Sequence, residues 1–108
     1  MCALPIRKAS PIAKEAQKFK IRIDSLMMKM QKEPKFTPTR KELEDCAEMI
    51  LDYIDHNHSK IASHATHLKA AIIDLTEVPE MAPQMQRISF LTSLKEASKN
   101  IELFLSCC

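Results

Sequence analysis

Four histidines lie within a stretch of twelve residues and are the clearest candidates for metal or acid–base chemistry in this chain. They are His56, His58, His64 and His67. Zinc sites on helices usually pair ligands at i and i+4 and add cysteine or carboxylate ligands. Only His64 and His67 come near that spacing, and no neighbouring motif supplies a nucleophile with an orienting group. We therefore expect no metal site, no cofactor and no enzymatic activity.

The cysteines form a second set of reactive side chains, namely Cys2, Cys46, Cys107 and Cys108. No pair has the spacing of a zinc ribbon or a thioredoxin motif. The final Cys107–Cys108 pair resembles the double-cysteine ends of prenylated small GTPases, and the resemblance covers these two residues. It implies lipidation of Cys107 and Cys108. Two lipid chains, or one chain with a basic surface, hold a protein stably at a membrane.

Glycine is absent from the sequence, and this excludes several ligand-binding motifs. Glycine supplies the positive φ of the tight turns in Walker, dinucleotide-binding and calcium-binding loops, so none of these motifs is present. No segment has the pattern of a signal peptide or of a membrane-spanning helix. The sequence therefore predicts a cytoplasmic protein whose cysteines remain thiols.

Charge is distributed unevenly along the chain. Residues 1–41 contain eleven Lys and Arg against three Asp and Glu, whereas residues 42–108 contain five against eleven. The net charge of only +2 conceals this division. Opposed blocks either bind each other within one fold or present a basic surface to an acidic partner. The sequence leaves both interpretations open.

Hydrophobic periodicity predicts an all-α protein, and the length of 108 residues fits a single domain, with residues 1–9 as a flexible N-terminal segment. Helices are expected from Ser10-Pro11 onward, from the capping box at Thr39, and after the break at 78–83. The apolar positions of these segments predict one core. Its expected members are Ile12, Phe19, Ile23, Leu26, Leu43, Ile50, Ile54, Ile61, Leu68, Ile72, Leu94 and Ile101.

The middle segment allows two architectures, because its apolar stripe keeps one helical phase from Leu43 to Leu75. A turn at Asn57 in the left-handed conformation, with Ser59 as the next cap, gives a four-helix up-down bundle. Without that turn, one helix of roughly 38 residues would be about 57 Å long, and three helices would be completed by dimerisation. We favour the bundle, because globular helices rarely exceed about 25 residues.

Two charged faces are expected on the first two helices. The basic stripe of the first helix lies within about 80° at 100° per residue, with Ser25 filling its gap. Its members are Lys14, Lys18, Arg22, Lys29 and Lys32. Ile21 and Met28 lie beside it, one heptad apart. The acidic face of the second helix consists of Glu44, Asp45, Glu48, Asp52 and Asp55.

These features favour a small non-catalytic interaction or adaptor module. Its candidate interface is the basic stripe together with Ile21 and Met28, and the expected partner is a protein with an acidic or helical surface. The alternative is a peripheral membrane protein attached through the basic helix and lipidated Cys107 and Cys108. A homodimer and an anionic membrane surface are further candidate partners. Nucleic acid is disfavoured, because the pI is 8.4 and no aromatic residue lies within the stripe.

Overall fold

The protein consists of five helices in the computed structural model, which describes residues 11–107 and the side chains of residues 14–106. The helices are α1 (Pro11–Lys32), α2 (Arg40–His56), α3 (His58–Ile61), α4 (Ala65–Thr76) and α5 (Pro83–Cys107). No strand occurs between residues 11 and 107. The all-α prediction is therefore confirmed.

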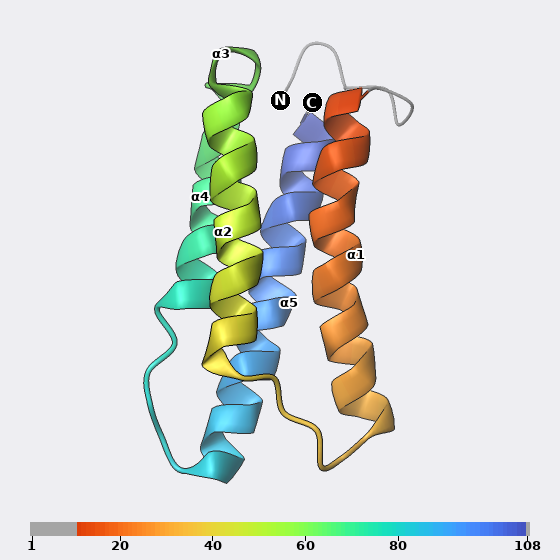
Figure 1. Ribbon diagram of the computed structural model, residues 1–108, viewed down its shortest axis with the longest axis vertical. Helices are drawn as coiled ribbons and strands as arrows, with labels where there is room; N and C mark the ends of the chain where they lie inside the picture. The colour runs from red at the N-terminus through yellow and green to blue at the C-terminus, as the bar shows by residue number, and fades with distance from the viewer. Residues whose placement is uncertain (1–10, 108) are drawn as a thin grey trace.

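The four long helices lie side by side in an elongated bundle measuring 44 × 24 × 22 Å. Helix α1 lies against α2 and α5, and α4 lies against the same two helices. Figure 1 shows successive long helices running in alternating directions, with α3 at one end of the bundle and the two long loops at the other. None of the described helices combines the length and the apolar character needed to cross a membrane.

The loop between α1 and α2 ends in a well-defined helix start. Thr39 is the N-cap of α2, and its hydroxyl oxygen accepts a hydrogen bond from the Glu42 backbone N–H at 3.2 Å. The Glu42 carboxylate lies 3.4 Å from the same hydroxyl rather than on the Thr39 amide, so one half of the expected capping box is present. Pro38 is buried and holds the loop against the bundle. Ser10, the expected cap of α1, lies outside the described residues.

The connection between α2 and α4 confirms the hairpin but corrects its details. Helix α2 ends at His56, so the continuous central helix does not form. Asn57 has φ −124° and ψ 21°, and no residue in the described range 11–107 has a positive φ, so the expected left-handed turn is wrong. Its side-chain amide instead donates to the Tyr53 carbonyl at 3.0 Å. Ser59 is not the next cap, because it lies within α3, and α4 begins after His64.

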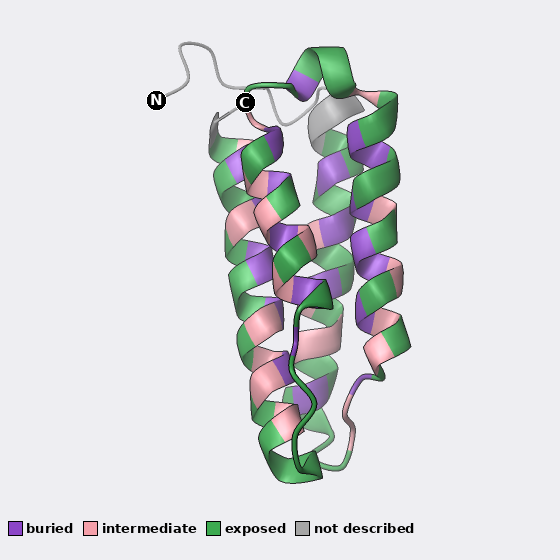
Figure 2. Ribbon diagram, turned by 90° about the vertical axis from the view of Figure 1, so that its left-hand side faces the viewer, coloured by how far each residue is buried: buried purple, intermediate pink, exposed green. Residues whose placement is uncertain are grey.

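The predicted core is largely correct. Figure 2 shows buried positions recurring along the inner side of each long helix. Leu26 and Ile72 are partly buried and pack against the core, and the side chain of Ile12 lies outside the described part. Every other expected member is buried. Tyr53, which periodicity did not select, joins three helices through edge-on contacts with Phe19 and Phe104, at centroid distances of 5.2 and 6.3 Å.

Two arginines bind the loop end of the bundle together. Arg40, at the start of α2, donates to the Val78 carbonyl at 2.6 Å, and Val78 lies in the α4–α5 loop. Arg87, near the start of α5, donates to the Met30 carbonyl in the last turn of α1. The Arg87 contact thus supplies a partner for one of the carbonyls in the last turn of α1, which have no intrahelical partner. The Arg87 contact holds the end of α1 against α5, and the Arg40 contact holds the start of α2 against the α4–α5 loop.

Candidate functional site

The basic stripe is exposed along the outer face of α1. All five of its cations are exposed, and Ser25, in the gap between them, is exposed as well. The opposite face of α1 is buried, with Ala16 and Ile23 completely inaccessible. The bundle thus holds α1 rigidly by its apolar side and leaves the stripe facing solvent.

A shallow hollow lies within the stripe. It is lined by Lys18, Ile21, Arg22, Ser25, Leu26 and Lys29, all from α1. Ser25 has the smallest side chain of the six, so the space between its larger neighbours is left unfilled. Ile21 and Leu26 supply apolar walls, and the aliphatic stems of the three cations extend them. Three residues of the stripe and one of its predicted apolar neighbours are therefore brought together at one place.

Two large apolar side chains flank the stripe on the outer face, as expected. Ile21 is 61% exposed and Met28 is 54% exposed. Ile21 also lines the hollow, whereas Met28 does not. A single exposed apolar residue is common on a protein surface, but here two lie beside a row of cations.

Two of the cations make contacts beyond α1. The Arg22 guanidinium reaches α2, where Nη1 lies 3.5 Å from the Met49 sulfur. Lys29 places its ammonium 4.4 Å from the centroid of the Phe36 ring, in a cation–π contact. The stripe therefore contains two cations anchored beyond α1, while Lys18 contacts Glu15 of its own helix and Lys14 and Lys32 are exposed on α1.

Cys46 lies near Arg22 inside the bundle. It is a free, buried thiol on α2. Burial raises the pKa of this thiol, and the nearby Arg22 guanidinium opposes that rise. A buried thiol with a raised pKa is a poor nucleophile, because the thiolate is the reactive form. Cys107 and Cys108 are the expected lipidation sites, and their side chains fall outside the range 14–106 for which the structure describes side chains. Cys2 lies outside that range as well.

The acidic face of α2 does not neutralise the basic stripe. Across the described side chains, the ion pairs within 4 Å are Lys18–Glu15 at 3.4 Å and Lys20–Asp24 at 2.8 Å, and both lie within α1. Four of the five acidic residues of the α2 face are exposed, and Asp45 is partly buried. The pairing of the two faces within one molecule, which the sequence left open, is therefore absent from this part of the chain.

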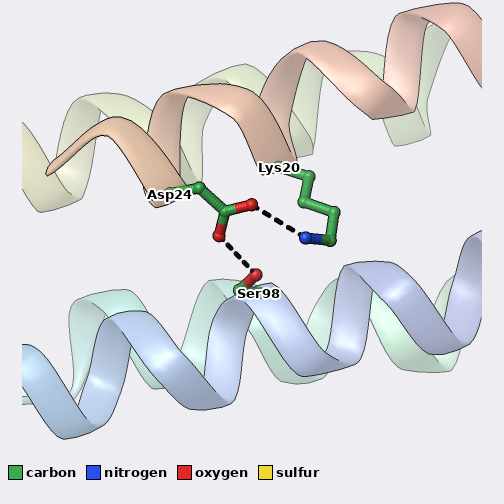
Figure 3. A network of polar contacts seen from close by, with 3 residues as sticks. All are labelled: Lys20, Asp24 and Ser98. Carbon is green, nitrogen blue, oxygen red and sulfur yellow. Dashed lines mark hydrogen bonds and ion pairs between the residues drawn. The ribbon is translucent and has the colours of Figure 1, made fainter. Parts of the chain in front are cut away.

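Polar contacts on the other flank of α1 join it to α5, and these were not anticipated from the sequence. Asp24 accepts a hydrogen bond from the Ser98 hydroxyl at 2.8 Å and from the Lys20 ammonium at 2.8 Å (Figure 3). Ser98 is buried. On the far side of α5, the Asn100 amide donates to Asp74 of α4 at 2.7 Å. The sequence feature that could have indicated these contacts is that each of them involves polar residues close to the apolar seams of their helices.

The histidines do not converge on a metal-binding arrangement. His56 has its Nδ1 2.8 Å from the Asp52 carbonyl on its own helix, and His64 stands before α4. Within the described residues, no group of three His, Cys, Asp or Glu side chains is placed to hold a metal ion. His56 and His58 are exposed, whereas His64 and His67 are partly buried.

The structure also reveals exposed apolar side chains that sequence reasoning did not select. Met85 and Ile88 share a face near the start of α5 and are 55% and 60% exposed. Met81, in the preceding loop, is 44% exposed. Their positions off the α5 seam were the available signal.

Comparison with known proteins adds no relative. The chain matches no family model, no curated protein and no solved structure.

Proposed function

We propose that this protein is a non-catalytic helical interaction module, and that the basic stripe of α1 binds an acidic surface on a protein partner. The observation that carries the proposal is the exposure of five cations on one face of a rigid helix, with no acidic residue of α2 paired to them in the described part of the chain. A face that serves only solubility usually mixes charges of both signs. Rows of one sign steer association with an oppositely charged partner.

A protein partner is favoured over direct insertion of α1 into a membrane. A helix that lies in a membrane interface buries a wide apolar face in the lipid. The wide apolar face of α1 is already buried in the bundle, where Ala16, Ile23 and Met30 are at most 1% exposed. The stripe therefore offers charge and two exposed apolar side chains, which suits a protein surface.

Affinity capture from the native host, followed by mass spectrometry, tests the proposal. The bait variants are the double reversal Lys14→Glu with Lys18→Glu and a matched control, Lys95→Glu with Lys99→Glu. Both pairs are exposed, are spaced i, i+4 on a long helix, and change the net charge equally. We expect a set of proteins that the wild type and the control retain and the stripe variant loses. Retention of the same proteins by all three would reject the stripe as the interface.

Co-sedimentation with anionic liposomes at two salt concentrations tests the membrane alternative separately. Electrostatic attachment weakens as salt screens the charges. Salt-sensitive sedimentation that the stripe reversal abolishes and the control preserves would favour the membrane and contradict a protein partner. We expect the wild type to sediment with the liposomes no more than the control variant does.

A further inference from the structure

The six residues around the hollow of α1 have the spacing of a helix-packing site. Lys18, Ile21, Arg22 and Ser25 occupy positions i, i+3, i+4 and i+7, and Arg22, Ser25, Leu26 and Lys29 repeat that spacing four residues later. Four residues in this arrangement form the hole that receives one side chain of a facing helix in a coiled coil. The hollow is therefore two adjacent holes that share Arg22 and Ser25.

We propose that the hollow receives an amphipathic helix of a protein partner, with apolar side chains seated over Ser25 and acidic residues flanking them. The proposal rests on the proposed function and specifies the kind of partner. The small side chain of Ser25 lies at the edge common to both holes, so it leaves room for an inserted apolar side chain. Ile21 and Leu26 form the apolar contacts on either side. Helix-in-groove recognition uses anchors at this same i, i+3, i+4, i+7 spacing.

The charge around the hollow determines the chemistry of the partner. Lys18, Arg22 and Lys29 surround the two holes, and no acidic residue lines them. In a pair of packed helices, charged residues beside the seam choose the partner by forming ion pairs across it. Lys14 and Lys32 continue the cationic row to both ends, over about 27 Å at 1.5 Å per residue. Aspartate or glutamate on both sides of the partner's apolar seam would face this row.

Arg22 is the best-placed cation to bind a carboxylate. Its contact with Met49 of α2 holds the side chain across the boundary between the two helices. A guanidinium restrained in this way loses less rotamer freedom on binding than a free lysine does, and it can donate two parallel hydrogen bonds to a carboxylate. We therefore expect one acidic residue of the partner to contact Arg22 beside the shared edge of the holes.

The test fills the hollow without changing any charge. Ser25→Trp places a large side chain in the hollow, and Gln17→Trp is the matched control, because Gln17 is exposed on α1 and does not line the hollow. The probe is a synthetic helical peptide of about three heptads, with Leu at a and d and Glu at e and g. A second peptide has Lys in place of Glu, and a third has a central proline that breaks the helix.

Binding is measured by fluorescence anisotropy of labelled peptides at low and physiological salt, after circular dichroism shows that both tryptophan variants are folded. The wild type and Gln17→Trp should bind the Glu peptide equally, and Ser25→Trp should bind it about tenfold more weakly. The Lys peptide and the proline peptide should not bind. Binding of the Glu peptide should weaken as the salt concentration rises.

Several outcomes would overturn the proposal. Equal binding by Ser25→Trp and the wild type, or binding of the proline peptide as tightly as the helical one, would show attraction by charge alone. Concentration-dependent dimers of the wild type that Ser25→Trp abolishes would identify a second copy as the occupant. If Ser25→Trp captures every host protein that the wild type captures, while the Lys14 and Lys18 reversal still loses its set, the helix proposal fails and the proposed function stands. If neither variant changes capture, both fail.

Discussion

The two flanks of α1 carry charged side chains that the protein uses in different ways. Towards α5, Asp24 is held by Lys20 and by the buried Ser98, so its charge is bound within the fold. On the outer face, the cations of the basic stripe face solvent, and only Lys18 pairs with a carboxylate among the described side chains, that of Glu15 on its own helix. On α1, charge near the seam therefore packs the helices together, whereas the charge further round the helix stays exposed.

The largest effect is expected for the core that supports both flanks. Ile50→Ala and Leu68→Ala each remove a large side chain that is completely buried. Each substitution should lower the free energy of unfolding by about 2–5 kcal/mol, because transfer and cavity costs add. Urea denaturation monitored by circular dichroism measures the change. A loss near zero at both sites would show that the bundle is not packed as described, and the contrast between the flanks would lose its basis.

A smaller effect is expected on the α5 flank. Asp24→Ala removes the acceptor of both the Ser98 hydroxyl and the Lys20 ammonium, and it leaves the buried hydroxyl without this partner. The free energy of unfolding should fall by about 1–2 kcal/mol, discounted because Asp24 is partly exposed. A double-mutant cycle with Ser98→Ala isolates the interhelical contact. Additive effects in that cycle would show that Asp24 and Ser98 do not stabilise each other, and the α5 flank would then contribute as little to stability as the outer face.

The other carboxylate bound to α5 should have a smaller effect that depends on pH. Burial raises the pKa of Asp74, and the hydrogen bond from Asn100 opposes that rise. A raised carboxyl pKa contributes stability that is fully present below the unfolded-state value and is lost as pH rises through the folded-state value. At neutral pH the wild type therefore bears the cost of a partly buried carboxylate.

Asp74→Asn removes that charge and keeps an oxygen that can accept from Asn100. The variant should melt at a slightly higher temperature than the wild type at pH 7, and the two should converge as pH falls below the Asp74 pKa. Thermal melts across the acidic range measure the difference. A variant that is less stable at pH 7, with a gap that widens towards neutral pH, would reverse the assigned sign.

The smallest effect on stability is expected on the outer face. Lys14→Glu with Lys18→Glu should change the free energy of unfolding by no more than about 0.5 kcal/mol, because exposed pairs contribute little. Arg22→Glu should cost more, since it removes the contact with Met49 and places a carboxylate beside the buried Cys46. Guanidinium denaturation of the wild type, the double lysine variant and Arg22→Glu measures their free energies of unfolding. Unfolding of the lysine variant would make the stripe a structural element.

The sequence predicted the helices and the core well because both follow from periodicity. Leu43, Ile50 and Ile61 occupy one helical phase, and each is fully buried. The positions of the cations were equally predictable, since helical phase alone places Lys18 and Lys29 away from the seam. The loops on either side of α2 were indicated by Pro34, Pro38 and Asn57.

The contacts between helices could not be predicted in this way. Helical phase places all five cations on the same face of α1 and does not distinguish them. In the structure, however, Arg22 contacts α2 and Lys29 packs on Phe36. The partners of Asp24 and Asp74 depend on which helices are neighbours and on their relative heights, and no local pattern encodes these. The hollow at Ser25 could not be predicted from periodicity either, because it depends on the sizes and orientations of six side chains together.

The backbone conformation of the turns in this bundle affects how the protein can be engineered. None of the described residues has a positive φ, so the backbone of both long loops lies in regions open to L-amino acids other than proline, which lacks the N–H and fixes φ. Tolerance in segments 33–39 and 77–82 should then depend on the buried Pro38 and Val78, on the partly buried Phe36 and on the Thr39 cap, rather than on a left-handed backbone conformation. A saturation scan of the loops should find Phe36, Pro38, Thr39 and Val78 restrictive and the other exposed positions permissive.

The common route of stabilising a protein by replacing turn glycines is closed here, because the chain has no glycine. Another source of gains in thermal stability is the set of exposed helix positions that are occupied by weak helix formers. Thr66 on α4 and Thr92 on α5 are two such positions.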